Sequence, residues 1–143
     1  MNLKDVLAAK GHRVVTVSAK SSVADAIHTM HAEKVGSVMV PDAEGCPVGI
    51  FTERDVVRLY ADGERDFDKL PVEARMTCSL VLGRLSMPVD EALGLMTERR
   101  FRHLPVVEGD RLLGLVSIGD LVKAKLNEAA QEAQALRAYI TSA

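Results

Sequence analysis

The stretch Gly49-Ile50-Phe51-Thr52-Glu53-Arg54-Asp55 returns sixty-five residues later as Gly114-Leu115-Val116-Ser117-Ile118-Gly119-Asp120. In each copy a glycine and two apolar residues precede a hydroxyl residue, and an aspartate follows three places after that hydroxyl. The likeness extends backwards, because residues 23–30 resemble residues 89–96 at an offset of sixty-six. The chain is therefore predicted to hold two copies of one unit, with its function located between them.

The length of the chain predicts that the two copies share one fold. A chain of 143 residues suits a single compact domain, whereas a unit half that long buries too little surface to be stable alone. We therefore expect the copies to pack on each other with pseudo-twofold symmetry, leaving clefts where like edges meet. The 48% of apolar and 27% of charged residues are typical of a globular protein.

Composition argues against several classes of protein. The net charge of −2 and the 3% of aromatic residues argue against a nucleic-acid partner, which needs a basic surface or a stacking platform. The sequence shows neither a signal peptide nor an apolar run of membrane-spanning length, so we expect a cytoplasmic protein with no membrane partner. Cys46 and Cys78 have no zinc-site or disulfide spacing, and His28 and His31 share a helix face without a third ligand, so no metal is expected.

Apolar periodicity and turn residues predict the order strand, helix, strand, strand, helix in each copy. The expected strands are 14–17, 38–40, 48–51, 80–82, 104–107 and 112–116. The expected helices are 2–10, 22–34 and those beginning near 52, 89 and 117. The predicted fold is α+β, with two β-α-β-β-α units and a long C-terminal helix. We assign the first unit with its N-terminal helix to 1–66, the second to 67–126, and a helical extension to 127–143.

The last helix carries an apolar seam whose members are spaced alternately by four and three residues: Val122, Leu126, Ala129, Ala133, Leu136 and Ile140. This spacing is the heptad pattern of a helix that contacts a helix of a second chain. The seam covers under three heptads, and a helix that packs back on its own domain explains it as well.

The repeated motif places chemistry at the start of a helix. The first N–H groups of a helix have no partner within it and carry positive partial charge, which favours an anion. The hydroxyl of Thr52 or Ser117 can donate to a phosphate, and the carboxylate of Asp55 or Asp120 can accept from both hydroxyls of a ribose. A capping box that merely closes the helix start is the alternative. Repetition of the motif, each time after a glycine, favours the ligand site.

With Met76-Thr77 opening the second copy and Arg102-His103-Leu104-Pro105-Val106-Val107 preceding its motif, the chain resembles a tandem pair of cystathionine-β-synthase-type (CBS) domains. Its tail resembles that of stand-alone bacterial members. The resemblance implies a regulatory Bateman module that is not an enzyme, requires no cofactor and associates as a homodimer. Its clefts would bind an adenosine compound such as AMP, ADP, ATP, NAD(H) or S-adenosylmethionine, and its protein target is unknown.

The same resemblance implies roles for individual residues. Both aspartates would bind ribose, Thr52 and Ser117 would bind phosphate or ribose oxygens, and Ile50 and Leu115 would line the adenine slot. The full set of candidate ligand-binding residues is Thr16, Ser21, Ile50, Thr52, Arg54, Asp55, Arg102, His103, Pro105, Leu115, Ser117, Gly119 and Asp120. A solvated helix face explains Arg54 equally well, and strand propensity and capping explain Thr16 and Ser21.

The two clefts are expected to differ. Arg102 and His103 suit phosphate, and the first copy has Gly36 and Ser37 in their places. This difference, with Gly119 allowing close approach to the helix start, predicts that the cleft with Asp120 is the better phosphate site.

Three hypotheses follow. The first is a sensor whose conformational equilibrium shifts when a nucleotide binds. The second is a metal-dependent hydrolase using Asp55 or Asp120, which has little support because no phosphate loop, nucleophile elbow or metal-ligand cluster is present. The third is a constitutive dimeric scaffold whose clefts stay empty.

Overall fold

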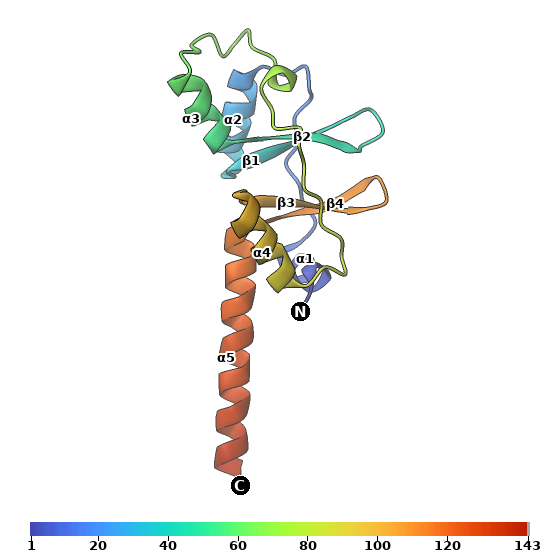
Figure 1. Cartoon of the computed structure of the whole chain (residues 1–143), viewed down its shortest axis with the longest axis vertical. Helices are drawn as coiled ribbons and strands as arrows, with labels where there is room; N and C mark the ends of the chain where they lie inside the picture. Colours follow the sequence, from blue (N-terminus) through green and yellow to red (C-terminus); the bar gives the residue numbers. More distant parts are fainter. Residues whose placement is uncertain (143) are drawn as a thin grey trace.

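Each half of the chain is built around an antiparallel hairpin, and the two hairpins lie one above the other in Figure 1. The computed structural model describes residues 1–142. The first repeat consists of α2 (Val23–Glu33), β1 (Ser37–Pro41), β2 (Pro47–Thr52) and α3 (Glu53–Ala61). The second consists of α4 (Val89–Arg99), β3 (His103–Glu108), β4 (Arg111–Ser117) and α5 (Ile118–Ser142). The helix α1 (Leu3–Lys10) precedes the first repeat and a 3-10 helix, Val72–Ala74, precedes the second. The predicted α+β class with two repeats and a long final helix is confirmed.

The predicted leading strands of the repeats are the exception. Residues 14–17 make one parallel bridge, Thr16 with Met39, and the segment predicted at 80–82 bridges one residue later, Gly83 with Val106. Two backbone hydrogen bonds join residues 14–17 to β1. The Val17 amide donates to the Met39 carbonyl at 3.0 Å, and the Met39 amide donates to the Val15 carbonyl at 2.9 Å. Backbone pairing between each of these segments and its hairpin is therefore limited to one bridge.

The two cores exchange the segments that precede these strands in the chain, namely α1 and residues 72–77, which are called the leading segments below. In the second core α1 contributes Leu3 and Leu7, both with no exposed surface, although chain order groups this helix with the first repeat. Conversely, Val72, which lies ahead of the second repeat, is fully buried in the core of the first. The core of each repeat is therefore completed by the segment that precedes the other repeat in the chain.

This exchange explains the repeated glycine of the motif. A Cβ built on Gly49 would lie 2.3 Å from the sulfur of Met76, and one built on Gly114 would lie 2.8 Å from Cδ2 of Leu7. Real Cβ atoms do not approach other heavy atoms so closely. Both glycines leave room on their hairpin for a side chain of the exchanged segment, so their first role is packing.

Helix α5 begins in the second core, where Leu121 is fully buried, and then extends away from the two repeats (Figure 1). The large side chains of its apolar seam are exposed: Val122 45%, Leu126 66%, Leu136 60% and Ile140 65%. The interpretation that this helix packs back on its own domain is therefore wrong. Within residues 1–142 no helix has the length and apolarity needed to cross a membrane.

Candidate functional site

Two cavities open at the boundary between the repeats, and each contains one of the repeated aspartates. The Asp55 cleft has a volume of about 700 Å³ and is lined by both repeats. The Asp120 cleft has a volume of about 440 Å³ and takes residues from the chain around α1, from the start of β1 and from the end of β4. Both volumes fall in the range of small-molecule sites, roughly 300–1,000 Å³.

The structure brings most of the predicted site residues to these two cavities. Those in the Asp55 cleft are Ile50, Thr52, Arg54, Asp55, Arg102, His103, Pro105 and Ser117. Those in the Asp120 cleft are His103, Leu115, Ser117 and Asp120. Three of the predicted residues line neither cavity: Thr16, Ser21 and Gly119. Thr16 makes a backbone bridge to β1, and the Ser21 carbonyl accepts from the Val72 amide at 2.8 Å, so both hold the fold.

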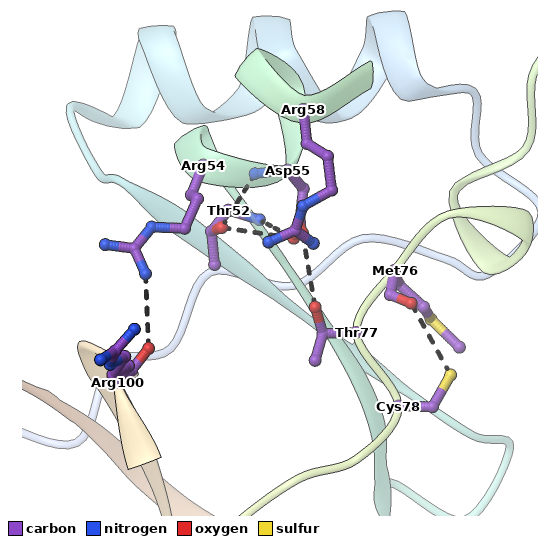
Figure 2. Close-up of polar contacts among 8 residues, drawn as sticks. All are labelled: Thr52, Arg54, Asp55, Arg58, Met76, Thr77, Cys78 and Arg100. Atoms are coloured by element: carbon purple, nitrogen blue, oxygen red, sulfur yellow. Dashed lines mark hydrogen bonds and ion pairs between the residues drawn. The ribbon is translucent and has the colours of Figure 1, made fainter. Parts of the chain in front are cut away.

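Asp55 closes the start of α3 and keeps one oxygen weakly held. Its Oδ2 accepts from the Thr52 amide at 2.9 Å and from the Thr52 hydroxyl at 3.2 Å. The Asp55 amide donates in turn to the Thr52 hydroxyl at 3.3 Å, which completes a capping box. Among the residues that the structure describes, its Oδ1 accepts only from Arg58 at 3.3 Å and from the Thr77 hydroxyl at 3.4 Å (Figure 2). Both contacts are long for hydrogen bonds, so ribose hydroxyls are stronger partners for this oxygen. Capping therefore occupies one oxygen of this side chain and leaves the other available to a ligand.

Asp120 is held more tightly. Its Oδ2 accepts from the Ser117 amide at 2.8 Å and from the ammonium of Lys10 at 2.5 Å. Lys10 also donates to the Leu115 carbonyl at 2.6 Å. Partial burial acts to raise the pKa of the Asp120 carboxyl, but the hydrogen bonds from Lys10 and the Ser117 amide outweigh it and place this pKa below its usual value. The carboxylate is thus ionised and paired within the chain.

Lys10 and Thr77 occupy matching places. Each comes from the segment that leads one repeat, and each reaches the aspartate of the other. The Thr77 amide donates to the Ile50 carbonyl at 2.8 Å, as the ammonium of Lys10 does to that of Leu115. The exchange of leading segments therefore supplies one side chain to each cleft. Chain order gives no sign of it.

Positive charge gathers in the Asp55 cleft. Five arginines line it against two carboxylates, those of Glu53 and Asp55; the arginines are Arg54, Arg58, Arg99, Arg100 and Arg102. The expectation that Arg102 equips the cleft with Asp120 is wrong, because the residues before β3 face the start of α3 in the other repeat. Three cations, Lys10, Arg13 and Lys34, line the smaller cleft. With His103 neutral, five arginines against two carboxylates leave the Asp55 cleft a net charge of +3, and three cations against Asp120 leave the smaller cleft +2.

The sequence interpretation missed six basic residues of these clefts, and for two of them, Lys34 and Arg100, a signal was present. Lys34 and Arg100 are separated by the same sixty-six residues as the repeated helices. Both end a helix in the left-handed conformation, with φ of 57°, where glycine or asparagine is usual. Lys34 lines the Asp120 cleft and Arg100 the Asp55 cleft, and the carbonyl of Arg100 accepts from Arg54 at 3.3 Å (Figure 2). A basic residue that recurs at the same left-handed helix end in both repeats, in place of glycine or asparagine, is therefore a sequence signal for a cation in each cleft.

His103 lines both cavities. Burial, followed by the positive charge of Lys10, lowers the pKa of its imidazole below the usual 6.5. The side chain is therefore mainly neutral at pH 7 and leaves the positive charge of the Asp55 cleft to the arginines. Among residues 1–142 no group of three or more histidine, cysteine, aspartate or glutamate side chains could hold a metal ion.

Comparison with known proteins agrees with this architecture. The family model of the CBS domain matches residues 3–62 and 72–127. The CBS domain-containing protein YhcV of Bacillus subtilis is 36% identical over 85% of this chain and 86% of its own length. The crystal structure of the CBS-domain containing protein ATU1752 from Agrobacterium tumefaciens is 43% identical, covers 87% of this chain and 99% of that one, and superposes with a TM-score of 0.84.

A more distant structure shares the fold alone. The CBS domain pair of protein MJ0100, solved in complex with 5'-methylthioadenosine and S-adenosyl-L-methionine, is 22% identical, with a TM-score of 0.77 over 87% of this chain and 98% of that one. Common descent explains the repeated motif, the two hairpins with exchanged leading segments and the paired clefts. This chain belongs to the CBS-domain family, with two CBS repeats.

Proposed function

We propose that this chain is a regulatory module that binds an adenosine nucleotide in the Asp55 cleft. The observation that carries the proposal is the convergence of five arginines on a cavity that also holds the Thr52 and Asp55 junction. Arginine binds phosphate oxygens through paired, charge-assisted hydrogen bonds. An anionic nucleotide such as AMP, ADP, ATP or NAD(H) suits this wall better than a positively charged sulfonium compound does.

The remaining contacts follow from the lining of the cavity. Ribose hydroxyls donate to Oδ1 of Asp55 in place of its two long contacts. Adenine lies against the apolar part of the wall, which includes Ile50, Leu80, Val81 and Pro105. These residues belong to both repeats, so a bound nucleotide ties the repeats together. The nucleotide shifts the equilibrium between two conformations of the module by no more than the difference in its binding free energy for them. A second chain or a protein target then binds one of these conformations preferentially.

The proposal is tested by titrating the protein with AMP, ATP and NADH in a calorimeter. The two matched variants are Asp55→Asn and Asp120→Asn, which remove the same charge from equivalent places. We expect the first to weaken nucleotide binding by about 10- to 100-fold, as expected for loss of a charged hydrogen-bond acceptor, and the second to change it by less than about threefold. Thermal unfolding of each variant checks that the fold is kept. Absence of binding by all three ligands at millimolar concentration, or the reverse ranking of the two variants, contradicts the proposal.

The pH dependence of binding gives an independent check through His103. A phosphate beside this imidazole raises its pKa from the lowered value of the free protein, so binding takes up a proton. The affinity for the nucleotide therefore increases as the pH falls from above the pKa of His103 in the complex towards its pKa in the free protein. We expect a gain of about three- to tenfold between pH 8 and pH 6. Calorimetry in buffers of different ionisation enthalpy measures the proton uptake, and His103→Gln reports the part that belongs to the ligand's own phosphate. Equal uptake by both proteins contradicts the role of His103.

A constitutive dimeric scaffold is the second candidate. The exposed apolar seam of α5 favours it, because this surface needs no ligand to pair with another chain. Dimerisation is compatible with both functions, and nucleotide binding separates them. We propose a homodimer in either case.

A further inference from the structure

Helix α5 carries an apolar seam, and no other segment of residues 1–142 covers the part of the helix beyond Glu128. Residues 129–142 are all exposed. Among the described residues, the last ion pair between this helix and the rest of the second repeat joins Lys125 to Asp90 of α4 at 3.1 Å. A helix of this length is marginal in water when it is isolated. Leucine and isoleucine at heptad spacing along it are the pattern of a two-helix contact.

The heptad places each residue relative to a partner helix. Positions a are Leu126, Ala133 and Ile140, and positions d are Val122, Ala129 and Leu136. The flanking positions g are Lys125, Glu132 and Tyr139, and the flanking positions e are Lys123, Ala130 and Arg137. In a parallel pair each g residue faces the partner's e residue five places further on; in an antiparallel pair like positions face each other.

The charges at these positions favour one orientation. A parallel, in-register pair places Glu132 beside the partner's Arg137, and symmetry makes this contact twice. An antiparallel pair that keeps the seam aligned has its centre at Gln131. That arrangement places Glu132 beside the partner's Glu132 and Lys123 beside the partner's Arg137, and both contacts are repulsive.

We propose that α5 pairs with α5 of a second copy of this chain as a parallel, in-register coiled coil. The two repeats of each chain then lie at the same end of the dimer. This inference rests on the proposed homodimer and not on nucleotide binding. It also connects the dimer with the clefts: Ile118 and Asp120 of the first turn of α5 line the Asp55 and Asp120 clefts, so cleft and seam share one helix.

Charge reversal tests the orientation when the dissociation constant of the dimer is measured by sedimentation equilibrium without added ligand. We expect Glu132→Lys and Arg137→Glu each to weaken the dimer by about tenfold, since each turns two attractive contacts repulsive, and the double variant to restore it. Gln131→Lys, at the outward position f, is the matched control and is expected to change little. An antiparallel pair predicts instead that Arg137→Glu tightens the dimer. That result, equal affinities of all variants, or a wild-type protein that stays monomeric overturns the proposal.

Disulfide trapping gives a second readout that does not depend on charge. In a background carrying Cys46→Ser and Cys78→Ser, Ile140→Cys places two thiols side by side across a parallel seam. In the antiparallel register the two positions are eighteen residues apart along the helix, about 27 Å at roughly 1.5 Å per residue, and a disulfide needs Cα atoms within about 7 Å. We expect Ile140→Cys alone to oxidise to a covalent dimer. Cross-linking only in a mixture with Val122→Cys, or none at all, overturns the proposal.

The two proposals fail separately. Calorimetry with AMP on the Glu132→Lys variant shows whether the clefts bind nucleotide once the seam is disrupted. Loss of binding by Asp55→Asn with unchanged dimerisation supports both proposals. Charge-dependent dimerisation with no nucleotide binding leaves the coiled coil and removes the sensor.

Discussion

Replacing Leu7 with alanine is expected to lower the free energy of unfolding by about 2–5 kcal/mol, the usual cost of emptying a buried leucine site. Leu7 has no exposed surface and lies in the core of the second repeat, although α1 precedes the first repeat in the chain. Urea denaturation followed by circular dichroism measures the loss. Leu82→Ala makes the same chemical change at a side chain that is 42% exposed, and it is expected to cost much less.

A double-mutant cycle then tests the exchange of leading segments. Gly114→Ala alone is expected to destabilise the protein by about 1–3 kcal/mol, because its Cβ would lie 2.8 Å from Cδ2 of Leu7. In the variant with both changes the new methyl group enters space that Leu7 has left. We expect the double variant to be more stable than the sum of the single effects predicts, with a coupling of about 0.5–3 kcal/mol. Strict additivity contradicts contact between α1 and β4.

Replacing Arg102 with glutamine is expected to weaken AMP binding by about 10- to 100-fold and to leave adenosine binding unchanged. The reason is that the substitution removes a charged donor to phosphate, worth about 1.5–3 kcal/mol, and leaves the ribose and adenine contacts in place. Calorimetry with the two ligands measures the difference directly. Arg111→Gln, on an exposed residue that lines neither cleft, is the matched control for the change in net charge.

The same experiment distinguishes the clefts. Arg102 lines only the Asp55 cleft, and Lys34 lines only the Asp120 cleft. If phosphate binds in the smaller cleft, Lys34→Gln weakens AMP binding and Arg102→Gln does not. That outcome would contradict the assignment of the nucleotide to the Asp55 cleft and would indicate that the nucleotide binds beside the carboxylate that Lys10 now holds.

Local features of the chain were predictable because they depend on neighbours in sequence. An N-cap needs a side-chain oxygen just before the first turn of the helix, and the helix starts after Ser22 and Thr52 were predicted to within one residue. Hairpins need turn residues between apolar strands, and both were found. The leading strands were overestimated, because apolar residues at 14–17 report burial at a sheet edge and not the number of backbone hydrogen bonds made there.

Arrangements between distant segments were not predictable in the same way. Arg102 was predicted to lie in the Asp120 cleft because it precedes the second motif in the chain. The packing of the two repeats places it in the Asp55 cleft instead. Nothing in the local sequence relates Lys10 to Asp120, which lie 110 residues apart in the chain. The heptad seam was visible, but only the exposed face of α5 decides against packing on its own domain.

By itself, the sequence determined the duplication, the order of most elements and the two junctions that combine a hydroxyl with an acid, since these depend on spacings of a few residues. Only the tertiary structure decided which repeat each leading segment completes, which cleft collects the arginines and which helix face is left uncovered. These outcomes depend on how two nearly equal units pack on each other. The sequence close to a residue does not show which residues of the other repeat it contacts.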